Sequence, residues 1–178
     1  MASTYLTKTF SSGDRQKFTF SFWFKTAGTG CYFMHSGNSS TSPEGGIEFS
    51  PTNGIRLWDS IGYDVGIINY LRDVNGWYHC VIAFDSTQAT STDRIKFYLN
   101  GTQATINPSY STYPSLNVQG SWNNNVLHTL GSYYNGISSH FNGSMAHFHF
   151  IDGTAYDAST FGETDATTGI WNLKLNHQ

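Results

Sequence analysis

Residues 16–25 read Gln-Lys-Phe-Thr-Phe-Ser-Phe-Trp-Phe-Lys, and this stretch decides the fold. A phenylalanine stands at every second position from Phe18 to Phe24, with polar residues such as Thr19, Ser21 and Lys25 at positions of the other parity. Because side chains alternate between the two faces of a β-strand, these aromatic rings share one face. Such a face needs a second layer to cover it, which predicts one sheet packed on another. A matching pattern at 144–153 indicates that both ends of the chain join the same structure.

The composition favours one folded domain over residues 1–178. Aromatic residues make up 16% of the chain and charged residues only 12%, and a chain of 178 residues can bury a sizeable core. A net charge of −3 without a basic cluster argues against nucleic acid or an anionic membrane as a partner. No apolar stretch is long enough to span a bilayer.

Two cysteines, Cys31 and Cys80, are too few for a disulfide framework. Cys80 shares its parity with the apolar residues of its segment, so we expect it to be a buried small apolar side chain. A bridge between the two cysteines stays open as an alternative, because pairing depends on distances that a sequence does not give.

Helical periodicity is almost absent, and short apolar runs alternate with turn residues, which is typical of an all-β sandwich or barrel. The Asn-Gly pairs at 53–54 and 100–101 predict tight hairpin turns, because both residues tolerate positive φ. Asp157 predicts a cap for a single helical turn over 157–161. Long connections are expected at 36–45 and 107–125. The expected strands are 3–9, 17–26, 31–35, 46–50, 54–58, 76–85, 94–100, 127–133 and 144–151.

Several segments, taken in order, resemble a known family. They are the early strand, the Trp-Tyr-His at 77–79, the segment 85–101, the late strand 141–153 and the Phe-Gly-Glu-Thr-Asp at 161–165. The chain resembles a laminin G-like module of the concanavalin A-like lectin/glucanase fold. More narrowly, it is similar to modules in virion proteins of marine bacteriophages. The resemblance implies an all-β, two-sheet antiparallel jelly-roll sandwich, a fold often used to bind carbohydrate or protein.

The function implied by this resemblance is that of a non-enzymatic module on the surface of a phage particle, of the fibre, head-fibre or capsid-decoration type. Its expected partners are other virion proteins or copies of itself as a homo-oligomer, and a host-surface glycan is a further candidate. Two alternatives stay open. One is a soluble carbohydrate-binding lectin, and the other is an endoglycanase of the same fold.

The late strand carries His147 and His149 where the similar modules tend to carry acidic or amide residues. The two histidines are two positions apart, so they point to one face of a strand. Two imidazoles alone do not make a metal site. We therefore expect this face to be a polar surface or an interface with another subunit, and we predict no metal there.

Glu163 and Asp165 form a Glu-x-Asp motif that is similar to the catalytic carboxylates of glucanases on this fold. Glycoside hydrolysis needs two carboxylates on either side of the scissile bond. The glucanase pattern continues with a second Glu, and Thr168 stands at that position here. We therefore expect no catalysis and interpret the motif as a capped turn or a surface loop.

Three aromatic residues of the second long connection, Tyr110, Tyr113 and Trp122, could stack on sugar rings. The adjacent Asn123 and Asn124 could supply amide hydrogen bonds. An equally good interpretation is that these rings fold back and close the core, because an ordered loop of this length must bury something.

Calcium is held by carboxylates and backbone carbonyls in some proteins of this fold. The candidates are Asp64, Asp85, Asp93 and Asp152, all near turns, where aspartate is common for conformational reasons. The chain has no dense Asp-x-Asp-x-Asp-Gly loop, so we predict no cofactor and keep calcium only as an alternative.

Overall fold

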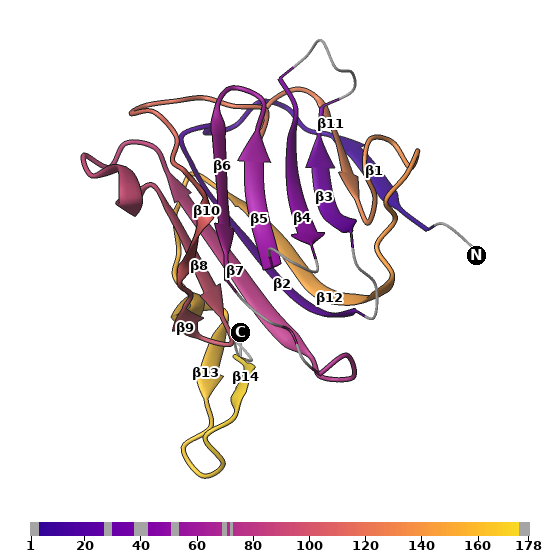
Figure 1. Cartoon of the computed structure of the whole chain (residues 1–178), viewed down its shortest axis with the longest axis vertical. Helices are drawn as coiled ribbons and strands as arrows, with labels where there is room; N and C mark the ends of the chain where they lie inside the picture. Colours follow the sequence, from indigo (N-terminus) through magenta and orange to yellow (C-terminus); the bar gives the residue numbers. More distant parts are fainter. Residues whose placement is uncertain are drawn as a thin grey trace.

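The computed structural model describes residues 4–26, 30–37, 43–50, 54–68, 71 and 73–174. Two antiparallel sheets pack face to face (Figure 1), which confirms the predicted all-β sandwich. The seven-stranded sheet has the order β1 (Leu6–Thr9), β11 (Leu127–Leu130), β3 (Cys31–Ser36), β4 (Gly45–Ser50), β5 (Gly54–Asp59), β6 (Tyr63–Ile67) and β10 (Ile106–Thr112). The five-stranded sheet has the order β12 (Gly143–Asp152), β2 (Lys17–Thr26), β7 (Tyr78–Asp85), β8 (Ile95–Leu99) and β9 (Thr102–Gln103).

The remaining elements are short. The 3₁₀ turn η1 (Ser91–Asp93) precedes β8, and η2 (Ala158–Thr160) precedes a small hairpin of β13 (Gly162–Thr164) and β14 (Trp171–Leu173). This hairpin extends away from the body of the sandwich in Figure 1. No helix in the described part of the chain is long and apolar enough to cross a membrane.

The aromatic face of β2 forms the centre of the core, as the alternation predicted. The four phenylalanines from Phe18 to Phe24 are at most 1% exposed. Phe18 stacks on Phe84 of the neighbouring β7 with 4.4 Å between ring centroids, and Phe22 meets Phe33 of the opposite sheet at 4.9 Å. Cys80, Ile82 and Phe84 are buried in the same core, as expected.

The other face of β2 is also covered, which the sequence did not predict. Thr19 and Ser21 lie opposite the phenylalanines, as the alternation requires, yet both are buried. Residues 153–174, here named the C-terminal segment, lie across this face. Thr19 Oγ1 donates a hydrogen bond to the Thr154 carbonyl at 2.7 Å and accepts one from the Tyr156 N–H at 2.8 Å. β2 is therefore a central strand that is buried on both faces.

Several predicted turns are confirmed. Asn100 and Gly101 both have positive φ, 47° and 80°, and they connect β8 to β9 as a tight hairpin. Asp157 caps η2 by accepting a hydrogen bond from the Ser159 N–H at 2.9 Å. Asn53 of the other Asn-Gly pair, and residues 38–42 of the first long connection, lie outside the described residues.

The prediction of a loop over 107–125 is wrong for residues 107–112. Residues 106–112 form β10, which pairs with β6 at the edge of the seven-stranded sheet. Both β10 and β6 are difficult to predict from the sequence, for physical reasons. β10 is polar, contains Pro108 and leaves one edge open, which is where proline is tolerated in a sheet. β6 is short, follows Gly62 and contains a buried Gly66.

Both cysteines are buried thiols, and no disulfide joins Cys31 to Cys80. Burial raises the pKa of the Cys80 thiol well above its ordinary value, so the side chain stays neutral. The expectation that Cys80 is a small apolar core residue is confirmed.

Replacing Phe22 by alanine is expected to lower the free energy of unfolding by about 3–5 kcal/mol, because the substitution removes a buried ring and leaves a cavity. Urea unfolding followed by tryptophan fluorescence measures the change. Ile170→Ala serves as the control: Ile170 is 60% exposed, so its truncation should cost less than about 0.5 kcal/mol. A Phe22→Ala protein as stable as the control would contradict the packing described here.

Candidate functional site

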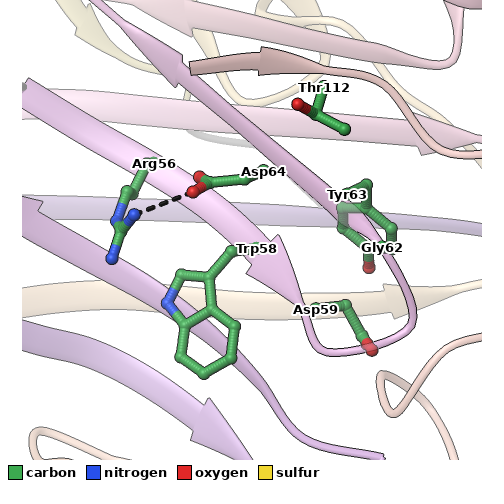
Figure 2. Close-up of a pocket in the computed structure, with 7 residues that line it drawn as sticks. All are labelled: Arg56, Trp58, Asp59, Gly62, Tyr63, Asp64 and Thr112. Carbon is green, nitrogen blue, oxygen red and sulfur yellow. Dashed lines mark hydrogen bonds and ion pairs between the residues drawn. The ribbon is translucent and has the colours of Figure 1, made fainter. Parts of the chain in front are cut away.

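The outward face of the seven-stranded sheet carries a cluster of charged and aromatic side chains. On β5, Ile55 and Leu57 point into the core, whereas Arg56 and Trp58 alternate with them and point outward. Figure 2 shows Arg56 and Trp58 next to each other on β5, with the Asp64 carboxylate of β6 reaching the guanidinium. These residues line a pocket of about 450 Å³.

Arg56 is held by carboxylates from both neighbouring strands. Its Nη2 donates to Glu48 Oε2 at 2.8 Å, and its Nη1 donates to Asp64 Oδ2 at 2.8 Å. Glu48 lies directly opposite Arg56 in the register of β4 and β5. The Tyr110 ring lies 5.2 Å from the guanidinium. The guanidinium is thus fixed in place, and its positive charge is more than balanced by two carboxylates.

Trp58 lies opposite Gly46 on one side and Asp64 on the other. A Cβ at Gly46 would come within 2.6 Å of the indole Nε1 and of the Tyr32 ring, so only glycine leaves room for both rings. The indole Nε1 of Trp58 and the Oδ1 of Asp64 are buried, and neither has a hydrogen-bond partner among the described residues. Burial raises the pKa of the Asp64 carboxyl, while the charge of Arg56 opposes this effect. One donor and one acceptor beside the aromatic ring are therefore buried without a hydrogen-bond partner among the described residues.

Further rings continue this face toward β11. Tyr32 lies 6.5 Å from Trp58 and 5.1 Å from Tyr133, and His35 meets Tyr133 at 4.5 Å, measured between ring centroids. His35 is fully buried, and neither of its ring nitrogens has a hydrogen-bond partner in the described part of the structure. We name this group the aromatic strip; its members are Tyr32, His35, Trp58, Tyr133 and Tyr134.

The predicted sugar-stacking role of Trp122 is wrong, because its side chain is 0% exposed. Its ring packs 5.0 Å from Phe20 and closes the core, which was the alternative interpretation. The loop is fixed by Asp59, whose Oδ2 accepts hydrogen bonds from the N–H and the hydroxyl of Ser121, both at 2.7 Å. A long-range contact thus decides the direction of this ring.

The two asparagines that follow Trp122 form hydrogen bonds with other parts of the chain. Asn123 is buried; its Nδ2 donates to the Asp14 carbonyl at 2.9 Å and to the Asp152 carboxylate. Asn124 Oδ1 accepts a hydrogen bond from the N–H of the next residue at 2.8 Å. Both amides are thus engaged with the chain itself, at positions outside the pocket beside Trp58.

Tyr110 and Tyr113, the two tyrosines of the predicted cluster, lie in different surroundings. Tyr110 is partly buried beneath Arg56 on the outward face, so it belongs to the site described above. Tyr113 is partly buried against the core, and burial raises the pKa of its hydroxyl. Only Tyr110 among the predicted ligand-binding residues contacts a residue of the Arg56 pocket.

His147 and His149 point to one face, as expected, although β12 is irregular between them. Ala146 pairs with Trp23 and His149 with Ser21, so two residues of β12 face one of β2. His147 adopts a positive φ of 49° within this bulge. Both histidines line a cavity of about 570 Å³ on the outer side of the five-stranded sheet. No group of three metal-ligating side chains occurs within the described residues. The role of His147 and His149 at an interface stays a prediction.

A serine and a histidine form a buried pair beneath this cavity. Ser21 Oγ lies 2.9 Å from His79 Nε2, and the Trp171 Nε1–H donates to His79 Nδ1 at 3.0 Å. An indole nitrogen only donates, so Nδ1 must accept and Nε2 must carry the proton. Nε2 therefore donates to the serine and cannot remove its proton. This arrangement does not activate Ser21 as a nucleophile.

Glu163 is exposed on β13, and Asp165 stabilises the turn of the small hairpin. The Asp165 carboxylate accepts hydrogen bonds from the N–H groups of Thr168 and Thr167 at 2.7 and 2.9 Å. The bonds from Thr168 and Thr167 lower the pKa of this exposed carboxyl. Asp165 thus caps a turn, as the sequence suggested for this motif.

Each aspartate considered for calcium has a local partner. Asp64 binds Arg56, and Asp93 lies 3.1 Å from Lys96. Asp85 accepts a hydrogen bond from the Thr87 hydroxyl at 2.6 Å, and Asp152 accepts one from the Asp14 N–H at 2.8 Å. These contacts account for the four carboxylates as turn and ion-pair residues.

The profile of the concanavalin A-like lectin/glucanase superfamily matches residues 2–159. Since this match covers most of the 178 residues, the chain belongs to that superfamily. The predicted concanavalin A-like jelly roll and the laminin G-like resemblance are thereby confirmed. No curated protein matches the sequence.

Solved structures share the fold at low identity. Domains LG4–5 of the mouse laminin α1 chain are 10% identical with a TM-score of 0.60, covering 87% of this chain and 40% of that one. Domain 4 of a GH43 extracellular arabinanase from Geobacillus stearothermophilus, in complex with arabinotriose, is 17% identical with a TM-score of 0.56, covering 82% and 64%. A heptameric pentraxin from Limulus polyphemus is 11% identical with a TM-score of 0.52, covering 82% and 68%. Laminin domains, a pentraxin and one domain of an arabinanase therefore share this fold, and this chain spans less than two thirds of the laminin and arabinanase structures.

The sequence interpretation missed the cluster around Arg56 and Trp58. A signal was present, because residues 54–59 read Gly-Ile-Arg-Leu-Trp-Asp and alternate between apolar and charged or aromatic side chains. Recognising a site also required Glu48 and Asp64 as cross-strand neighbours, and that register comes only from the folded sheet.

Acid is expected to destabilise the fold through buried neutral histidines. Burial lowers the pKa of His79 and of His128 to about 4 in the folded protein, below the ordinary 6.5 of an unfolded chain. The unfolded state therefore binds more protons between these values, so the free energy of unfolding falls as the pH drops below 6.5 toward 4. His79→Asn should flatten this fall, because one such proton accounts for up to about 1.4 kcal/mol per pH unit.

Urea unfolding at several pH values between about 4.5 and about 7.5 measures this slope. The slope for His79→Asn is compared with that of the unaltered protein. Equal slopes for His79→Asn and the unaltered protein would show that His79 does not contribute to acid destabilisation.

Proposed function

We propose that this chain is a non-catalytic carbohydrate-binding module whose ligand lies on the outward face of the seven-stranded sheet. The pocket beside Arg56, Trp58 and Asp64 forms the centre of the site, and the aromatic strip extends it. The observation that carries the proposal is an open pocket lined by Arg56, Trp58 and Asp64 next to aromatic rings; Trp58 Nε1 and Asp64 Oδ1, buried beside it, lack hydrogen-bond partners among the described residues.

A sugar hydroxyl suits this pair, because it can accept a hydrogen bond from the indole N–H and donate one to the carboxylate. The C–H face of a sugar ring is apolar and can pack on Trp58 or Tyr32. The site carries two carboxylates against one guanidinium, which disfavours an acidic sugar. We therefore propose a neutral oligosaccharide as the ligand. The arabinanase domain that shares the fold was solved with such a ligand, arabinotriose.

Trp58→Ala is expected to weaken binding of a neutral oligosaccharide at least tenfold, or about 1.4 kcal/mol, because the ring face and the N–H are both lost. A glycan array selects the best ligand, arabinotriose being included, and isothermal titration calorimetry measures the affinity. Trp77→Ala is the matched control: Trp77 is 44% exposed and lies beside Lys25 of the five-stranded sheet.

Equal loss of affinity in both tryptophan variants would place the ligand elsewhere. The absence of any bound neutral glycan would contradict the proposed function itself. Release of shorter sugars from the bound glycan by the unaltered protein would contradict its non-catalytic part and favour the endoglycanase alternative.

We further propose that the module works on the surface of a phage particle, attached to other virion proteins or to copies of itself. The resemblance to marine phage modules supports this placement. One structural observation favours self-association: β1 is an edge strand, all four of its residues are exposed, and Leu6 is 67% exposed. An open strand edge with an exposed apolar side chain can pair with a like edge.

Leu6→Lys is expected to convert an oligomer of the purified protein into monomer, because a lysine on the strand edge opposes pairing with an identical edge. Sedimentation velocity measures the oligomeric state. Ile170→Lys, at an exposed position on the small hairpin, should leave the oligomer intact. A protein that is monomeric at all accessible concentrations would contradict self-association through β1.

A further inference from the structure

The second cavity lies on the opposite side of the molecule from the proposed sugar site. It is enclosed between the outer side of β2 and β12 and the C-terminal segment, and its volume is about 570 Å³. This size lies within the range of small-molecule sites. We name it the histidine cavity. Its apolar walls are Trp23, Ile151, Tyr156, Phe161 and Leu173.

The polar groups that line the histidine cavity are imidazoles, hydroxyls and one amine. His147, His149 and Lys174 line it together with the hydroxyls of Ser21 and Thr160, and none of its described lining residues carries a carboxylate. The indole Nε1 of Trp23 is buried and has no hydrogen-bond partner among the described residues. A cationic amine in a pocket without acidic groups favours an anionic ligand over a cationic one.

Local geometry holds these groups in position. The bulge in β12 adds a residue between Ala146 and His149, so that His147 and His149 both face the cavity. Bulges frequently redirect side chains in this way at functional sites. The floor is rigid, because Trp23 stacks on His79 at 4.9 Å, and His79 is fixed by hydrogen bonds to Ser21 and Trp171. His149 stacks on Phe161 of the C-terminal segment at 6.1 Å.

We propose that the histidine cavity binds a small organic anion with an aromatic ring, such as an aryl carboxylate. The ring lies among Trp23, Tyr156 and Phe161, and the anionic group accepts hydrogen bonds from the two imidazoles. Lys174 supplies the opposite charge. This site is independent of the sugar site, because it lies on the other sheet and shares no residue with the Arg56 pocket.

The test uses 1-naphthoate as the probe and its neutral isostere 1-naphthamide as the comparison, both titrated into the full chain by isothermal calorimetry. Saturable binding of 1-naphthoate is expected, with the amide at least tenfold weaker. Thr160→Asp places a carboxylate at an exposed position that lines the cavity, so it should weaken 1-naphthoate at least tenfold and change the amide little. Thr164→Asp, at an exposed position on β13, is the matched control.

The double variant His147→Gln, His149→Gln should also lose at least tenfold in affinity for 1-naphthoate, while His140→Gln keeps it. Thermal unfolding of each variant shows that the fold is retained. The proposal is overturned if 1-naphthoate does not bind saturably, if the amide binds equally well, or if Thr160→Asp and the double histidine variant bind as the unaltered protein does. Sugar binding can fail or succeed separately, since its own variant, Trp58→Ala, lies on the other sheet.

Discussion

The structure depends on the burial of β2 on both faces. One face carries the phenylalanine row that meets the opposite sheet, and this contact holds the two layers together. The other face carries polar side chains that cannot stay buried without partners. Thr19 and Ser21 find theirs in the C-terminal segment and in His79, so covering this face requires specific hydrogen bonds as well as contact.

This arrangement makes the two outer surfaces of the sandwich different. The C-terminal segment lies over the outer side of the five-stranded sheet, with the histidine cavity beneath it. Glycines at the contact let Trp171 come close, since a Cβ at Gly101 or Gly162 would collide with its ring. The outer face of the seven-stranded sheet has no such cover over Arg56 and Trp58. Its side chains must satisfy one another, and they do so only in part.

Strand alternation made much of the core predictable. The positions from Phe18 to Phe24 could be placed from sequence because a period of two leaves one choice of face. Loop residues have no such period. Trp122 turned inward because Asp59, far away in sequence, accepts two hydrogen bonds from Ser121. The site around Arg56 was hidden for a related reason, since its chemistry arises from the register that places Glu48 and Asp64 beside it. Local patterns thus predict layers, whereas sites depend on contacts between distant strands.

The same contacts bear on whether this chain carries out chemistry, on a fold that laminin domains and a domain of an arabinanase share. A hydrolytic site needs two carboxylates that are free to exchange protons with a substrate. On the open face, Glu48 and Asp64 are both bound to Arg56. Beneath the other cavity, the proton on His79 Nε2 prevents Ser21 from acting as a nucleophile. Glu48, Asp64, Ser21 and His79 therefore make structural contacts, which is consistent with the proposed non-catalytic module.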